Sequence, residues 1–338
     1  MRVRTIVMVL VALLAAPILA VAQSQWTDGP VNPVIPPPNP GAWDGHRYTA
    51  AVLEVDGTYH LYYLGQLSSS SEIDDVQIGH FTSLDGVAWE IDQGNPVLPW
   101  GAPGEWDDVG AGGGGVIHDG SLFWYWYGGA DGQTTRVGYA TSGNGSLWTK
   151  HGPVIGLEAG PPGSWYDWGM VPGTVIVRDG LYQMWFFAAR TVGPDDYDWR
   201  VGYAWSEDGM NWNMLPDPVL GPRPGHDRMV VLGLNVVFDG SGYHMWYLTD
   251  ESTPGAVNIA YAVSPDGIEW TRYPWNPVVG GRSGPCAVLR DQDTGDYTMW
   301  YTDQPGFSIR RATSECCPGV FYDGFDFGDT AGWTVTVP

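Results

Sequence analysis

Residues 173–221, GTVIVRDGLYQMWFFAARTVGPDDYDWRVGYAWSEDGMNWNMLPDPVLG, contain four phrases that recur along the chain. The first phrase is a short apolar run ending in Asp-Gly, and the second is an aromatic run in which large residues return with a period of two. The third phrase is VGYAWS, and the fourth runs from Trp212 to a Pro-Val pair. A period of two is typical of strands, and Asp-Gly favours a hairpin turn. Each unit therefore predicts four short antiparallel strands, the content of one propeller blade.

The number of units follows from counting the phrases. The first three phrases occur five times, with aromatic runs that begin at Tyr59, Phe123, Tyr182, Tyr243 and Tyr297. The fourth closes four units, and it also stands alone near the N-terminus as QWTDGPVNPVIPP, residues 25–37. The last unit, which ends at Ser314, lacks a fourth phrase of its own. We therefore predict an all-β fold, a five-bladed β-propeller of four-stranded antiparallel blades whose ring is closed by the N-terminal strand.

The two ends of the chain lack this repeat. Residues 1–22 combine a basic start, an apolar run and a small-residue cleavage site, which predicts a secretory signal peptide. A retained membrane anchor is the alternative, but the apolar run is short for a span. We expect residues 1–22 to be the signal peptide, 23–315 the propeller and 316–338 a C-terminal tail of unknown role. The protein is then secreted, extracellular or periplasmic, with no membrane partner after signal cleavage.

The charge balance limits the partners. Thirty-eight acidic residues face fifteen basic ones, for a net charge of −23, so the chain repels nucleic acid and anionic lipid. We therefore exclude both as partners and expect a monomer. Export permits a disulfide between Cys286 and either Cys316 or Cys317, which leaves one of the three thiols over.

The turns and strands resemble those of a known enzyme group. S-x-D-G turns followed by Trp, M-W-Y strands and N-P-V endings are similar to the five-bladed propeller glycosidases, the arabinanase, levansucrase and invertase group with glycoside hydrolase families 43 and 32. The resemblance covers nearly all of residues 25–315. It implies a polar funnel on the propeller axis with three carboxylates from different blades: a base or nucleophile, a general acid and an orienting group. Two carboxyl groups flank the scissile bond, and their separation determines retention or inversion.

The chain departs from this group where its members carry Asp-Pro, because Tyr48, Thr49 and Ala50 stand there. The turns also resemble the Asp-box of sialidases, shortened by one residue, and their repetition favours a structural role. The site is therefore predicted from topology: the chain enters each blade on its innermost strand, so the segment before the first phrase borders the funnel. These segments are 41–49, 104–113, 163–172, 225–233 and 281–285.

Polar and aromatic residues of these segments, with one arginine of the last unit, form the predicted site. The catalytic candidates are Asp44 as base or nucleophile, Glu105 or Asp108 as acid, and Asp167 and Asp227 as supporting carboxylates. The substrate-binding candidates are His46, Arg47, Tyr48, Asp107, Trp168, His226, Arg228 and Arg310. For any single Asp the alternative is a loop cap that belongs to the repeat. The glycines of 111–115 indicate close packing at the axis or room for a ligand.

The predicted function is that of a secreted glycoside hydrolase, or glycosidase-like protein, whose partner is a poly- or oligosaccharide. The alternative is a non-catalytic propeller that binds carbohydrate or protein at the cell exterior. A third reading is a polysaccharide lyase that uses His46 or His226 with a tyrosine. No cofactor and no metal ligand is expected; a structural Ca²⁺ among the carboxylates is compatible with the sequence, but residue spacing gives no argument for it.

Overall fold

The computed structural model describes residues 25–39, 41–69, 75–193, 196–222, 230–249, 257–281 and 283–315. These residues form twenty β-strands and no helix, so the predicted all-β class is confirmed. Accordingly, the described residues include no helix long and apolar enough to cross a membrane. The predicted signal peptide and C-terminal tail, together with His226, Asp227 and Arg228, lie outside the described residues.

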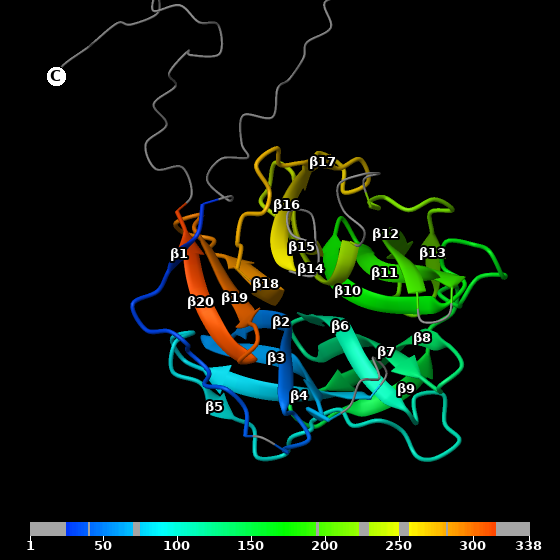
Figure 1. The fold of residues 1–338 in the computed structure, drawn as a ribbon, viewed down its shortest axis with the longest axis horizontal. Coiled ribbons are helices and arrows are strands. Elements are labelled where there is room, and N and C mark those ends of the chain that lie inside the picture. The colour runs from blue at the N-terminus through cyan, green and yellow to red at the C-terminus, as the bar shows by residue number, and fades with distance from the viewer. Residues whose placement is uncertain are drawn as a thin grey trace, which may run out of the picture.

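Three antiparallel sheets hold four strands each (Figure 1). The first contains β2 (His46–Val55), β3 (Thr58–Gln66), β4 (Val76–Ser83) and β5 (Glu90–Ile91). Another contains β14 (Val230–Phe238), β15 (Tyr243–Thr249), β16 (Asn258–Ser264) and β17 (Thr271–Arg272). The last contains β18 (Ser283–Arg290), β19 (Tyr297–Asp303), β20 (Ser308–Ser314) and β1 (Thr27–Asp28).

The second and third sequence units share one larger sheet. The second unit contributes β6 (Gly110–His118), β7 (Phe123–Ala130), β8 (Thr135–Ser142) and β9 (Thr149–Pro153). The third contributes β10 (Gly169–Arg178), β11 (Leu181–Gly193), β12 (Asp196–Ser206) and β13 (Trp212–Met214). A single parallel pairing, between Gly169 and Thr135, joins the two antiparallel units.

The innermost strands lie nearest the centre of the molecule, and the fourth strands lie at its periphery (Figure 1). The innermost strands β2, β6, β10, β14 and β18 contact one another in that order, and β18 also contacts β2. The apolar core lies between neighbouring units: Trp185 of the third unit, for example, packs in one cluster with Tyr243 and Met245 of the fourth. Each sheet therefore buries a face against the next unit, which is why the second phrases are rich in large aromatic residues.

The isolated N-terminal phrase completes the last sheet. Thr27 and Asp28 pair with Thr313 and Ala312 of β20, and Ile35 forms a further bridge to Ile309. In Figure 1 the blue β1 accordingly lies beside the orange β20. The first unit uses its own fourth phrase in the same way, since β5 pairs with β4 and Leu98 bridges to Ile78.

A repeated hydrogen bond connects one unit with the next. In each case an aromatic side chain from the second strand of one unit donates a hydrogen bond to the glycine carbonyl of a Ser-x-Asp/Asn-Gly turn in another unit. The pairs are Tyr62 to Gly145 (2.8 Å), Trp126 to Gly209 (2.7 Å), Trp185 to Gly267 (2.8 Å) and Trp300 to Gly86 (2.9 Å). These turns therefore have the structural role that their repetition indicated, and the Trp300 bond links the last unit to the first.

Candidate functional site

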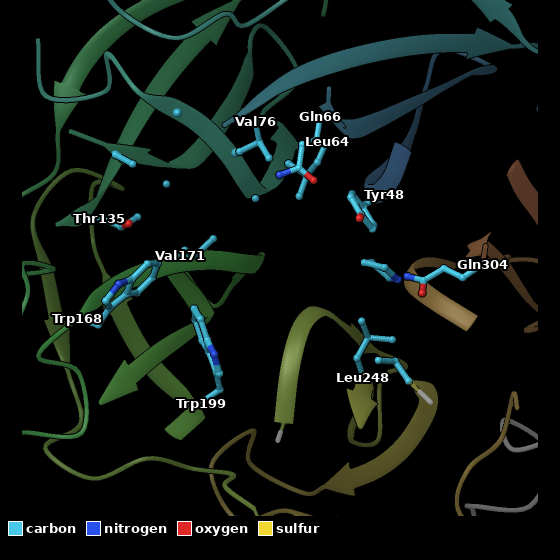
Figure 2. A pocket seen from close by; sticks show the side chains of 17 residues that line it. Tyr48, Leu64, Gln66, Val76, Thr135, Trp168, Val171, Trp199, Leu248 and Gln304 are labelled. Atoms are coloured by element: carbon cyan, nitrogen blue, oxygen red, sulfur yellow. The ribbon is translucent and has the colours of Figure 1, made fainter. Parts of the chain in front are cut away.

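A cavity of about 250 Å³ lies between the inner ends of the sheets (Figure 2). Its lining repeats from unit to unit, because equivalent strand positions face it. The third strands and the residues just before them contribute Val76, Thr135, Trp199 and Val257. The first strands contribute Tyr48, Gly112 and Val171, and the second strands contribute Leu64, Gly128 and Leu248.

Aromatic side chains stand on opposite sides of this cavity. Trp168 and Trp199 form one wall, with ring centroids 5.1 Å apart and planes inclined by 66°. Tyr48 and Gln304 lie on the other side in Figure 2. Burial raises the pKa of the Tyr48 phenol, so its hydroxyl stays protonated and can donate a hydrogen bond.

The polar groups of the lining are neutral. Gln66 ends β3 and Gln304 follows β19, so the two amides occupy the same repeat position in the first and last units. Thr135 adds a hydroxyl group. Among the described lining residues there is no carboxylate, and the wall is mainly apolar. Such a lining suits a neutral ligand with both apolar faces and hydroxyl groups.

The glycine run of β6 makes this geometry possible. A Cβ on Gly112 would lie 2.3 Å from Val76, and a Cβ on Gly113, whose φ is +70°, would lie 2.3 Å from Val171. Both glycines also line the cavity. The run therefore provides close strand packing and leaves room at the centre, the two alternatives left open by the sequence.

Asp44 and Asp107 are buried and already hold partners. The Asp44 carboxylate accepts hydrogen bonds from Arg47 Nε (2.8 Å) and from the Tyr63 hydroxyl (2.8 Å). In the second unit, Asp107 is bonded in the same way to Lys150 Nζ (2.6 Å) and to the Tyr127 hydroxyl (3.0 Å). Neither carboxylate lines the cavity.

Two other units vary this arrangement of carboxylate, tyrosine and cation. In the last unit Tyr301 donates to Asp28 of β1 (3.0 Å), and Arg310 contacts both. In the third unit Tyr166 stands in place of the aspartate and Phe186 in place of the tyrosine. The tyrosine hydroxyl and its carboxylate acceptor are thus both absent from these two positions, as expected of two groups that form a hydrogen bond with each other.

The remaining carboxylate candidates that the structure describes accept hydrogen bonds from backbone amides. Asp108 accepts from the Gly104 amide (2.6 Å), and Asp167 accepts from the equivalent Gly163 amide (2.7 Å). Glu105 accepts from the Ala102 amide (2.9 Å). Desolvation raises the pKa of Asp167, but the amides of Thr191 and Gly163 outweigh it and hold the pKa below its usual value. Such a carboxylate is a poor proton donor.

Two further candidates, His46 and Arg47, contact aromatic rings and do not line the cavity. His46 stacks on Phe307 with a centroid distance of 4.0 Å, and Arg47 lies over the Tyr63 and Phe81 rings. Of the predicted site residues that the structure describes, Tyr48 and Trp168 line the cavity.

Sequence reasoning missed Trp199, Gln66 and Gln304. Their signal was their place in the repeat: Trp199 precedes the third phrase by two residues, and each glutamine lies three residues beyond the second-phrase tyrosine Tyr63 or Tyr301. In the described part of the chain, no group of three or more His, Cys, Asp or Glu side chains could hold a metal ion.

No protein-family model matches this chain. It is similar to an uncharacterized protein of Mycobacterium tuberculosis strain H37Rv, with 29% identity over 185 residues. The match covers 52% of this chain and 58% of that protein, so the chain spans little more than half the length of this relative.

Solved structures give a broader match. One is a candidate glycosidase of Bacteroides thetaiotaomicron, with a TM-score of 0.66, 16% identity and coverage of 87% of this chain and 97% of that one. Another is a family 117 glycoside hydrolase of Zobellia galactanivorans, with a TM-score of 0.61, 16% identity and coverage of 86% and 90%. At these identities the likeness concerns the fold alone. The predicted likeness to families 43 and 32 stays a prediction.

Proposed function

We propose that the strands form a five-bladed β-propeller closed by the N-terminal strand. The pairing of β1 with β20 and the cyclic order of contacts among the innermost strands support this arrangement. The eight-stranded sheet then represents two blades joined at one position. Closure would cover sheet edges that an open array leaves exposed. Secretion, the signal peptide and the monomeric state remain predictions from the sequence.

We further propose that the protein binds a carbohydrate in the central cavity. The observation that carries this proposal is the pairing of an aromatic wall, Trp168 and Trp199, with the amides of Gln66 and Gln304 in one lining. Aromatic rings offer an apolar face to the C–H groups of a sugar, and amides can both donate to and accept from its hydroxyl groups. The protein is in this sense glycosidase-like.

Glycoside hydrolysis is the second candidate function, and the shared fold with glycoside hydrolases favours it. Hydrolysis requires two carboxyl groups beside the scissile bond. Asp44 and Asp107 are held by cations and tyrosines, and the described cavity lining has no carboxylate. Catalysis would thus depend on carboxylates outside the described lining. Of the five predicted catalytic carboxylates, Asp227 is the one that lies outside the described residues, so it is tested here.

The test uses the protein without residues 1–22 and a panel of oligosaccharides from arabinan, xylan, fructan, mannan and acidic glycans. Calorimetry measures binding, and chromatography measures sugar release. We expect saturable binding to one class, weakened about tenfold by Trp168→Ala and by Gln304→Ala. Trp275→Ala, which removes a 73% exposed aromatic that does not line the cavity, serves as the control. A folded protein that binds no member of the panel would contradict the proposal.

Sugar release separates the two candidate functions. Release that is lost in Asp227→Asn would establish a hydrolase and identify its substrate class. Binding without release at any tested pH would establish a binding propeller.

A further inference from the structure

The hairpin of β11 and β12 extends beyond the cavity. In the first and second units the corresponding ladders end at Gln66–Val76 and Ala130–Thr135. The equivalent pair of the third unit is Ala189–Trp199. Three more pairs follow it, namely Arg190–Asp198, Thr191–Tyr197 and Gly193–Asp196. The β11–β12 hairpin of the third unit therefore extends past the cavity, whereas the corresponding hairpins of these other two units end there.

Hydrogen bonds hold the extended part of this hairpin in place. Asp198 accepts from Arg190 (3.1 Å) and from Arg200 (2.8 Å), which ties the two strands together through their side chains. The Thr191 amide donates to Asp167 (2.8 Å), and this bond connects the extended hairpin to the loop before β10. A group carried by the hairpin is consequently held in place before a ligand arrives.

The extended hairpin continues the aromatic surface that Trp168 and Trp199 form at the cavity. Tyr197 and Trp199 are two residues apart on β12 and so share a face. The Tyr197 ring lies 5.4 Å from Trp168 and 6.2 Å from Trp199, between ring centroids. Both tryptophans line the cavity, and Figure 2 shows them on one side of it. Tyr197 is half-buried, so part of this residue remains exposed to solvent.

We propose that Tyr197 binds a second sugar unit, and that the ligand is an oligosaccharide rather than a single sugar. The inference rests on the proposed carbohydrate site. A unit in the cavity contacts Trp168 and Trp199, and the unit linked to it lies over Tyr197. The phenol supplies an apolar face together with a hydroxyl group that can donate to or accept from the sugar. The extended hairpin thus selects for chain length.

The experiment measures dissociation constants for linear xylo-, manno-, arabino- and cello-oligosaccharides of one to six units. For the series that binds, we expect wild-type affinity to increase from one unit to two or three. Tyr197→Ala should leave affinity for the single sugar unchanged and weaken binding of longer members about two- to tenfold. Trp168→Ala should weaken every member, because it contacts the first unit. Trp275→Ala is the matched aromatic control.

The outcomes separate this inference from the proposed function. If Tyr197→Ala binds oligosaccharides of every length as tightly as the wild type does, Tyr197 does not bind a second sugar unit. The proposed sugar site in the cavity is unaffected by that result. If Tyr197→Ala weakens the single sugar as strongly as the longer members, the tyrosine serves the cavity itself and the length argument fails. If the wild type binds neither these series nor any other member of the panel above, the proposed function fails and the inference fails with it. Circular dichroism of Tyr197→Ala and Tyr197→Phe verifies that both variants fold.

Discussion

At the scale of single residues, Asp44 and Asp107 illustrate how one sequence pattern allows two interpretations. Both follow a tryptophan before an innermost strand, so the sequence allowed either an axial carboxylate or a repeated structural pair. Their contacts with a tyrosine hydroxyl and a cation match each other closely. A buried carboxylate held in this way contributes to stability through charge-assisted hydrogen bonds.

Asp107→Ala should lower the free energy of unfolding by about 2–4 kcal/mol, because it leaves Lys150 and the Tyr127 hydroxyl without their acceptor. Urea denaturation measures this change. Asp119→Ala, which removes the cap of an exposed turn, is a milder comparison. Full stability combined with lost ligand binding would instead indicate a role in the site.

A second residue-scale prediction concerns pH. His60 Nδ1 lies 3.0 Å from His80 Nε2, and His80 Nδ1 lies 2.9 Å from Asp92. Burial, reinforced by His80 and His118, lowers the pKa of His60 from 6.5 to about 4. Between these values the unfolded chain binds more protons than the folded one, so stability falls as pH decreases from 6.5 toward 4. The loss from His60 should reach up to about 3 kcal/mol.

Denaturation at a series of pH values tests this prediction. His60→Gln should flatten the acid limb of the stability profile. His151→Gln, at an exposed histidine, should leave the limb unchanged. Parallel profiles for wild type and His60→Gln would show that this histidine does not determine the acid sensitivity.

At the scale of elements, the Ser-x-Asp-Gly turns connect local and tertiary structure. Asp208 accepts from the Asn211 and Met210 amides, and these bonds lower its pKa. Gly209 has a φ of +74°, and its carbonyl accepts from Trp126 of another unit. The turn was predictable from its residues, because capping and positive φ are local requirements.

Gly209→Ala should destabilise the protein more than Gly57→Ala does. Both glycines have φ near +75°, so each substitution costs about 1–2 kcal/mol in backbone strain. A Cβ at Gly209 would also lie 2.8 Å from the buried Trp126 ring, whereas nothing lies within 4 Å of a Cβ at Gly57. Unfolding free energies compare the two. Equal losses would mean that the ring moves aside without cost.

At the scale of the whole molecule, the N-terminal phrase joins two distant parts of the chain. Ile35 is 1% exposed and bridges to Ile309, whereas Val31 in the same phrase is 55% exposed. The proposed ring depends on this segment, since it occupies the outer edge of the last sheet.

Ile35→Ala should therefore cost about 2–5 kcal/mol of unfolding free energy. Val31→Ala should cost less than about 0.5 kcal/mol, because an exposed side chain loses little on truncation. Urea denaturation of both variants measures the difference. Similar stabilities would show that the N-terminal phrase contributes little to the folded molecule.

The sequence by itself determined the strands, the turns, the all-β class and the partner of the N-terminal phrase. These features depend on a period of two, on turn residues and on a count of repeats, all of which are visible along the chain. Tertiary structure alone decided which side chains meet at the centre. Trp199, Gln66 and Gln304 come from three separate units, and the long β11–β12 hairpin is aligned with the cavity by sheet register. The direction of Asp44, toward Tyr63 rather than the cavity, likewise depends on packing against a strand nineteen residues away.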